Sequence, residues 1–106
     1  SRKLDGVTEG VTEGVSKGVI NKVEGVIEGV IEGVTKDVRD KLKKILLVIY
    51  NNKGIRGNAI AKITEIPVKS IERYLKELKD AELVEFKGAP RTGGYQLTRR
   101  TINRIK

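Results

Sequence analysis

A degenerate four-residue repeat occupies residues 6–36 and constrains the fold more than any other feature of the sequence. It has the form Gly-Val-x-Glu, and one position is missing at Lys22-Val23-Glu24. Residues four apart stay near one face of an α-helix, whereas in a strand this period would place Val and Glu together on one face. The three-residue step from Val23 to Val26 turns the stripe back, as a stammer does in a coiled coil. The repeat therefore predicts a helix with a Val/Ile stripe.

The composition of the repeat opposes a helix that stands alone. Its seven glycines each cost about 1 kcal/mol relative to Ala in a helix, and the β-branched residues add to that cost. Such a helix needs a partner surface for its apolar stripe, and Gly at every fourth position would let a second helix approach closely. We expect a long helix that joins copies of the chain into a homo-oligomer. The alternative is a flexible low-complexity linker.

The second half of the chain has the pattern of an ordinary globular domain. A first helix is predicted at about 37–51, and Val34 continues its stripe upstream, so the repeat is expected to run into this helix without a break. The apolar residues of this helix recur at helical spacing and are Val38, Leu42, Ile45, Leu46 and Ile49.

Stop signals and caps divide the rest of this half into short elements. Asn58 is a plausible N-cap for a second helix that ends near Glu65, and Pro67 opens a third helix that runs to about Ala81. Apolar and polar residues alternate after the third helix, which predicts a β-hairpin. The expected remaining elements are a very short strand at 55–56, strands at 82–87 and 95–98 joined by the loop 88–94, and a short helix or frayed tail at 99–106.

This order of elements resembles bacterial winged helix-turn-helix domains. The resemblance covers roughly 60 residues and is carried by Ala59-Ile60-Ala61-Lys62, Ile66-Pro67-Val68-Lys69-Ser70-Ile71, Arg73-Tyr74-Leu75-Lys76-Glu77-Leu78 and Ala81-Glu82-Leu83-Val84. It implies a mainly α fold with a small β-hairpin wing, preceded by the long Gly/Val-repeat helix. We therefore expect a repeat segment at 1–36, a winged helix-turn-helix domain at 37–98 and a basic tail at 99–106.

The repeat followed by such a domain also resembles the C-terminal end of RecG-helicase-related proteins and putative transcriptional regulators. Those proteins carry a Schlafen/AlbA-type domain at the other end. This narrower resemblance implies that the chain is one part of a longer bacterial protein.

The charge of the chain is concentrated in the predicted domain. Residues 1–40 hold six basic and eight acidic residues, whereas residues 41–106 hold 16 basic and six acidic ones. A compact basic half next to an acidic segment favours a polyanion partner, and we expect duplex DNA. The alternative is a soluble domain that happens to be basic.

The third helix carries the predicted base-reading residues. In a helix-turn-helix the second helix of the motif enters the major groove. Lys69, Arg73 and Lys76 lie about 140–200° around the helix from Ile71 and so point outward. The fork of Arg73 matches the O6 and N7 of guanine, and the two lysines suit phosphates. Ser70 stands at the helix start, where its hydroxyl can meet a base or a phosphate.

Two acidic residues argue against this interface. Glu72 and Glu77 lie on or near the same surface, where they would oppose a phosphate backbone. The alternative is a solvated face with i,i+4 pairs such as Glu72–Lys76.

The hairpin is the second predicted contact. Lys87, Arg91 and Thr92 bracket a Gly-rich tip that can approach a DNA backbone, although a plain hairpin with solvated charges explains them equally well. Arg56 and Asn58 at the start of the second helix are expected to add a backbone clamp. The tail residues expected to add nonspecific affinity are Arg99, Arg100, Arg104 and Lys106.

Several functional classes are disfavoured by what the sequence lacks. The chain has no His and no Cys, which removes the commonest general base and the thiolate ligands, so we expect neither an enzyme nor a cofactor or metal site. The glycines do not form a phosphate loop, and the glutamates do not form a calcium loop. No apolar run approaches the roughly 20 residues of a membrane span. We expect a cytoplasmic DNA-binding module, with a protein-interaction or oligomerisation module as the alternative.

Overall fold

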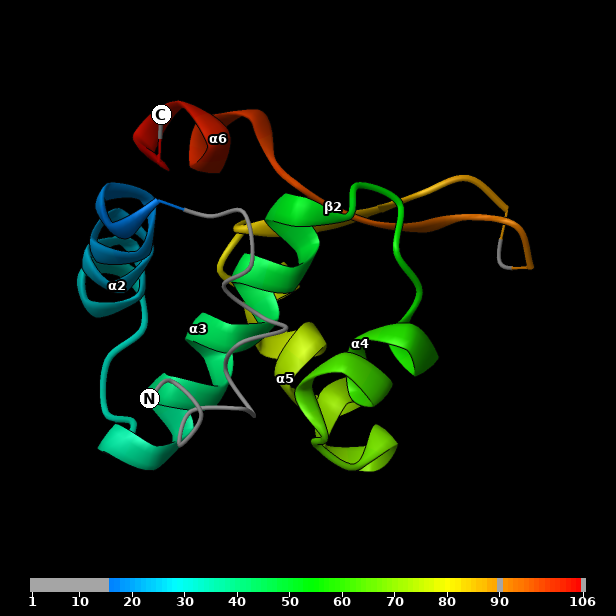
Figure 1. Ribbon diagram of the computed structural model, residues 1–106, viewed down its shortest axis with the longest axis horizontal. Coiled ribbons are helices and arrows are strands. Elements are labelled where there is room, and N and C mark those ends of the chain that lie inside the picture. The colour runs from blue at the N-terminus through cyan, green and yellow to red at the C-terminus, as the bar shows by residue number, and fades with distance from the viewer. Residues whose placement is uncertain (1–15, 90, 106) are drawn as a thin grey trace.

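The computed structural model describes residues 16–89 and 91–105 and has the predicted fold class, mainly helical with one two-stranded hairpin (Figure 1). The antiparallel hairpin extends away from the helices as a wing, so the winged helix-turn-helix architecture is confirmed. In chain order, the elements are α2 (Lys17–Val30), α3 (Lys36–Asn51), α4 (Gly57–Thr64), α5 (Val68–Asp80), β1 (Val84–Lys87), β2 (Gly94–Leu97) and α6 (Arg99–Ile105).

Helix α3 is the centre of the core, as its stripe predicts. The hydroxyl of Thr35 accepts a hydrogen bond from the backbone N–H of Val38 at 3.2 Å, which satisfies one unpaired donor of the first turn. The helix ends at Asn51, where the sequence predicts its end. Its fully buried side chains contribute to a single apolar cluster and are Leu42, Ile45, Leu46, Leu47, Val48 and Ile49.

The turn between α4 and α5 is built from local hydrogen bonds. Glu65 adopts a left-handed conformation with φ 62°, and the hydroxyl of buried Thr64 donates to the carbonyl of Ile60 at 2.8 Å. Two predicted details are wrong by one or two positions. Arg56 rather than Asn58 precedes the first residue of α4, and Pro67 is the cap of α5 rather than its first helical residue. Neither cap residue uses its side chain to cap the helix.

The wing is joined to the core by a third short segment. Within the hairpin, Val84 pairs with Leu97 and Lys87 pairs with Gly94. Ile55 forms an isolated bridge to Tyr95, which confirms the predicted very short strand. Gly94 is required there, because a Cβ at this position would lie 1.9 Å from the carbonyl oxygen of Gly54. The turn after α3 therefore fixes the base of the wing against the core.

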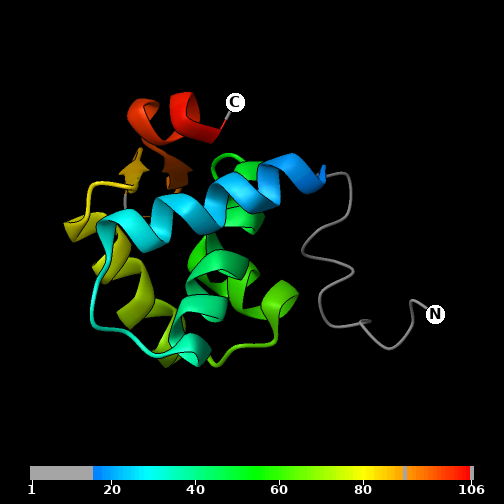
Figure 2. The same ribbon diagram turned by 90° about the vertical axis from the view of Figure 1, so that its left-hand side faces the viewer.

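The described part of the repeat is a helix, but the prediction of one long unbroken helix is wrong. Helix α2 ends at Val30, and Gly33 turns the chain back with a φ of 77° before Thr35 caps α3. Figure 2 shows α2 lying across α3 with α6 beside it. Residues 1–15, with the first part of the predicted self-associating segment, lie outside the described residues.

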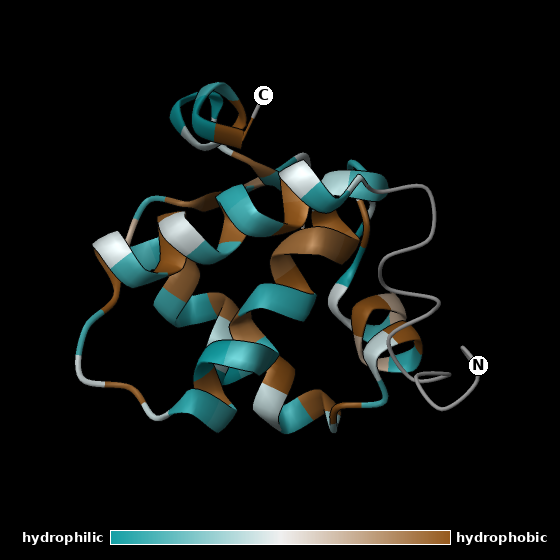
Figure 3. Ribbon diagram, turned by 60° about the vertical axis from the view of Figure 1, so that its left-hand side comes forward, coloured by the Kyte–Doolittle hydropathy of each residue, from teal (hydrophilic) through white to brown (hydrophobic). Residues whose placement is uncertain are grey.

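The apolar stripe of α2 is covered by the chain itself. Val23, Val26 and Ile27 are buried, so the three-residue step in the repeat does keep the stripe on one face, as predicted. Figure 3 shows these apolar stretches of α2 alternating with polar ones along the helix. A Cβ at Gly25 would meet nothing within 4 Å, so this glycine is not used for close packing among the described residues. The partner surface that the stripe needs is supplied within one molecule.

The basic tail is the helix α6, one of the two outcomes expected for it. Thr101 and Ile105 are fully buried. The hydroxyls of Thr98 and Thr101 lie 2.8 Å apart, which joins the start of α6 to the end of the wing. Because α6 packs against α2, the hydrophobic cluster contains residues from all three predicted segments. The predicted division into 1–36, 37–98 and 99–106 stays a prediction.

Candidate nucleic-acid interface

Helix α5 is strongly amphipathic, with one apolar face turned into the core. Its buried side chains are Ile71, Tyr74, Leu75 and Leu78. The opposite face is solvated, and on it Lys69, Arg73 and Lys76 are exposed, as the helical spacing predicts. Ser70 in the first turn is half-buried, whereas its neighbour Val68 is 40% exposed. The structure therefore presents the start of α5 and its three predicted cations to solvent.

Arg73 lies against the ring of the residue that follows it. Its guanidinium carbon is 5.6 Å from the centroid of the Tyr74 ring, within the range of a cation–π contact. Tyr74 is only 5% exposed, so its ring is a fixed platform. At an exposed position such a contact is worth about 0.5–1 kcal/mol, which orients the guanidinium without consuming its N–H donors.

Acidic residues share the exposed face of α5. Glu72, Glu77 and Asp80 are all exposed. Lys76 lies 3.5 Å from Asp80, and it does not form the pair with Glu72 that the sequence suggested. Both partners are more than 70% exposed, so this ion pair contributes little and Lys76 can leave it at low cost. The structure thus leaves Glu72 and Glu77 exposed on α5, while their opposition to a phosphate backbone stays a prediction.

Three cations of α3, namely Arg39, Lys41 and Lys43, form ion pairs within the chain. Lys43 lies 2.7 Å from Glu24, and Arg39 lies 3.6 Å from Glu28. The hydrogen bond from Lys41 to Asp37, together with the charge of that carboxylate, raises the pKa of Lys41 above 10.5. Within the described part of the chain, the cations that take part in no ion pair include Lys69 and Arg73 on α5 and Lys87 and Arg91 on the wing.

The tip of the wing is a tight glycine turn that carries its predicted residues outward. Arg91 and Thr92 are exposed, as is Lys87 at the end of β1. The N–H groups of Thr92 and Gly93 both donate to the carbonyl of Ala89, at 3.2 and 2.6 Å. A Cβ at Gly93 would lie 2.2 Å from the carbonyl oxygen of Lys87, so the turn requires glycine there.

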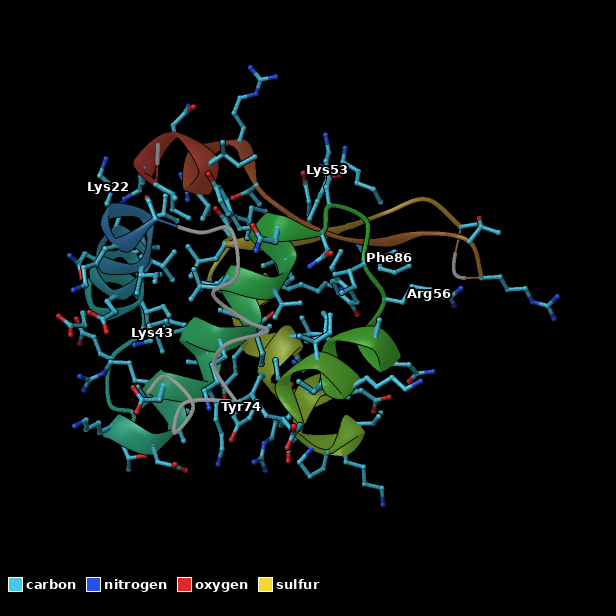
Figure 4. All side chains as sticks on the ribbon, viewed as in Figure 1. Lys22, Lys43, Lys53, Arg56, Tyr74 and Phe86 are labelled. Carbon is cyan, nitrogen blue, oxygen red and sulfur yellow. The ribbon has the colours of Figure 1, made fainter. Side chains whose placement is uncertain are left out.

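Arg56 is placed differently from the expectation for it. Its guanidinium donates a hydrogen bond to the backbone carbonyl of Arg91, 35 positions further along the chain. Figure 4 shows Arg56 extending below the hairpin toward the wing tip. Arg56 therefore braces the wing and brings Arg91 close to the start of α4. Asn58 is exposed in the first turn of α4.

A second basic surface, which the sequence did not predict, lies on the other side of the wing. A groove of about 480 Å³ runs between the turn after α3, the outer face of the hairpin and α6. Three cations from three separate elements line it, namely Lys53, Lys87 and Arg99. Lys53 and Arg99 are 46 positions apart, so no local pattern places them together.

The described residues offer little for other kinds of site. Among residues 16–89 and 91–105, no three acidic side chains lie close enough to hold a metal ion. In the same ranges, no helix combines the length and apolar character that crossing a membrane requires.

One of three comparisons with known proteins gives a match, and it agrees with this geometry. Neither the curated proteins nor the solved structures contain a match to the chain. The narrower resemblance to RecG-helicase-related regulators finds no support in these comparisons and stays a prediction. A family model does match residues 39–85, from the first turn of α3 into β1, and its description is winged helix-turn-helix DNA-binding. Residues 39–85 thus match a winged helix-turn-helix DNA-binding family, in agreement with the observed fold.

Proposed function

We propose that this chain binds duplex DNA through the exposed face of α5 and the basic wing, as the DNA-binding module of a transcriptional regulator or a helicase-related protein. It acts by binding and not by catalysis. One observation carries the proposal. The exposed cations on the outer face of α5 and at the wing tip form no ion pair within the described chain, with the exception of Lys76. Arg39 and Lys43 of α3, by contrast, are paired. Unpaired exposed cations on a basic domain are available to replace the counterions of a phosphate backbone.

The residues of α5 divide between reading and positioning. Arg73 presents a planar fork that matches the O6 and N7 of guanine, and the rigid Tyr74 ring beside it limits the entropy lost on binding. Lys69 and Lys76 would contact phosphates and set the orientation of the helix in the major groove. Ser70 is in the first turn, where its hydroxyl can contact either group.

The wing would follow the backbone next to the groove that α5 occupies. Lys87 and Arg91 supply charge, and Thr92 supplies a hydroxyl donor at the tip. Arg56 acts through the wing, because its hydrogen bond to the carbonyl of Arg91 orients the tip. Asn58 would contact the backbone from the start of α4.

The proposal is tested on duplexes selected from a random pool, with affinity followed by fluorescence anisotropy at about 50 mM salt, where backbone contacts bind strongly. Arg73→Ala should cost about 1–3 kcal/mol on the selected site and relax the preference at one base pair. Arg73→Lys keeps the charge but not the fork, so it should bind while losing that preference. Lys36→Ala is the control, because it removes an exposed charge from the first residue of α3, which belongs to neither α5 nor the wing. Absence of duplex binding, or equal effects of Arg73→Ala and Lys36→Ala, would reject the proposal.

A protein-interaction module is the second candidate, and the acidic residues of α5 favour it. Glu72, Glu77 and Asp80 make the exposed face mixed in sign, as docking surfaces often are. Association of copies through the repeat belongs to this candidate. Light scattering on the chain with and without residues 1–15 tests it while leaving α2 on the core. Oligomers that require residues 1–15, combined with no DNA affinity, would replace the first candidate with this one.

A further inference from the structure

The groove on the outer face of the wing has the composition of an anion site. Lys53, Lys87 and Arg99 are exposed along it, and none of them takes part in an ion pair within the described chain. Three unpaired cations around one concavity repel one another, and a bound anion would relieve this repulsion.

The one acidic residue of the groove is already engaged. Glu85 accepts a hydrogen bond from the side-chain amide of Gln96 at 3.1 Å, and both residues are half-buried on the outer face of the hairpin. The charges that line the groove are thus three positive and one negative. Asn103 adds an exposed amide from α6, and Leu97 and Ile102 also line the groove.

This groove does not lie on the side of the wing that Arg56 braces. In Figure 4, Lys53 points away from the hairpin on one side, and Phe86 and Arg56 lie on the other. Phe86 packs edge-on against the Tyr95 ring, with centroids 5.1 Å apart. Alternation along the strand places Glu85 and Lys87 on the face opposite Phe86. The outer groove and Arg56 therefore lie on opposite sides of one thin hairpin.

We propose that this outer groove binds phosphate groups, with Lys53, Lys87 and Arg99 as the cations and Asn103 as an additional hydrogen-bond donor. A phosphate monoester carries about −1.5 to −2 charges and three acceptor oxygens, and a duplex backbone offers several singly charged phosphates in a row, so either can satisfy several cations at once. A single carboxylate carries one charge and gains less from three cations. The inference does not depend on α5 reading DNA. The phosphate comes either from a duplex backbone or from a small phosphorylated molecule.

The test uses inorganic pyrophosphate as the probe, titrated into the full chain in the absence of DNA. Binding is followed by the backbone amide resonances of Gln96, Arg99 and Asn103. The variant Lys53→Gln/Arg99→Gln removes two cations from the groove and leaves Lys87, which the wing proposal also uses. The matched control is Lys17→Gln/Lys36→Gln, which removes two exposed charges from the starts of α2 and α3.

Saturable shifts at these amides are expected, with affinity reduced roughly a hundredfold in the groove variant, about tenfold for each cation removed. The control should keep the original affinity. Shifts spread over the whole surface, or equal affinities for the groove variant and the control, would overturn the proposal. Unchanged amide patterns in the absence of pyrophosphate would show that both variants are folded.

A second arm identifies the source of the phosphate. If the groove holds duplex backbone, the groove variant should lower the slope of log affinity against log salt by about 2, since each phosphate contact contributes roughly 0.9. If the slope stays constant while pyrophosphate affinity falls, the ligand is a small phosphorylated molecule. Both results support a phosphate site. Absence of duplex binding by the unaltered chain, with pyrophosphate binding intact, would reject the proposed function and leave this inference standing.

Discussion

Helices α2 and α5 both lay an apolar face on the same core, yet they direct their charges in opposite ways. On α2, Glu24 and Glu28 reach across to Lys43 and Arg39 of α3. On α5, the one ion pair among the described residues joins Lys76 to a neighbour on the same helix. The charges of α2 are used to fix it on the molecule, whereas those of α5 face outward.

The two helices also differ in how far their sequences favour a helix. Helix α2 contains three glycines, Gly18, Gly25 and Gly29, while α5 contains none and is rich in good helix formers such as Leu, Lys and Glu. Helix α2 is nevertheless formed, because Val23 and Ile27 are buried completely. Tertiary burial and ion pairs therefore replace intrinsic propensity in α2, whereas the polar face of α5 remains available for binding.

The prediction with the largest expected effect asks whether α2 is part of the core or an arm that can detach from it. Ile27→Ala should lower the free energy of unfolding by about 2–4 kcal/mol, because it empties a fully buried position. Leu75→Ala on α5 is the matched control and should cost a similar amount. Urea unfolding followed by circular dichroism measures both. If Ile27→Ala costs under about 1 kcal/mol while Leu75→Ala costs the full amount, α2 is not integral to the core.

Much of the fold could be predicted from local patterns. The stripe from Leu42 to Ile49, the turn before Pro67 and the alternation in the wing each depend on neighbours within a few residues, so sequence spacing fixes them. The partner of the repeat could not be predicted in this way. Periodicity shows that α2 has an apolar face, but the reversal at Gly33 and the burial against α3 and α6 depend on packing between distant segments.

In the candidate site, too, some features follow from local sequence spacing and others depend on packing between distant segments. The outward direction of Lys69, Arg73 and Lys76 follows from helical geometry and is observed. Arg56 contacts the wing 35 positions further along the chain, and Lys53 and Arg99, which are 46 positions apart, line the same groove. Both arrangements arise only when the hairpin packs on the helices. Their roles in binding are proposals that the variants above test.

An intermediate effect tests whether the glycines of α2 have a structural purpose. Gly25→Ala should raise the free energy of unfolding by about 0.5–1 kcal/mol, because a Cβ there meets nothing within 4 Å and Ala favours the helix. Gly33→Ala is the contrasting variant, since its site is equally open but has a φ of 77°. It should destabilise by about 1–2 kcal/mol.

Thermal unfolding of both glycine variants gives the comparison directly. A loss of stability in Gly25→Ala would mean that the glycine face of α2 is covered by something other than residues 16–89 and 91–105. A lower oligomer mass for that variant would point to a second copy, as the repeat predicts.

The prediction with the smallest expected effect compares the strength of an ion pair that joins α2 to α3 with that of the ion pair within α5. A double-mutant cycle with Glu24→Gln and Lys43→Gln should give a coupling energy of about 0.5–1 kcal/mol, because the pair is short and Lys43 is only 22% exposed. The same cycle on Lys76 and Asp80 should give about 0.3 kcal/mol or less. That pair is highly exposed, longer, and has the cation on the N-terminal side, which is the weaker orientation in a helix. Salt at about 1 M should reduce both couplings, because screening acts within about 3 Å at that concentration. Equal couplings in the two cycles would mean that the charges of α2 fix it no more firmly than those of α5 fix one another, and the contrast between the two helices would not hold.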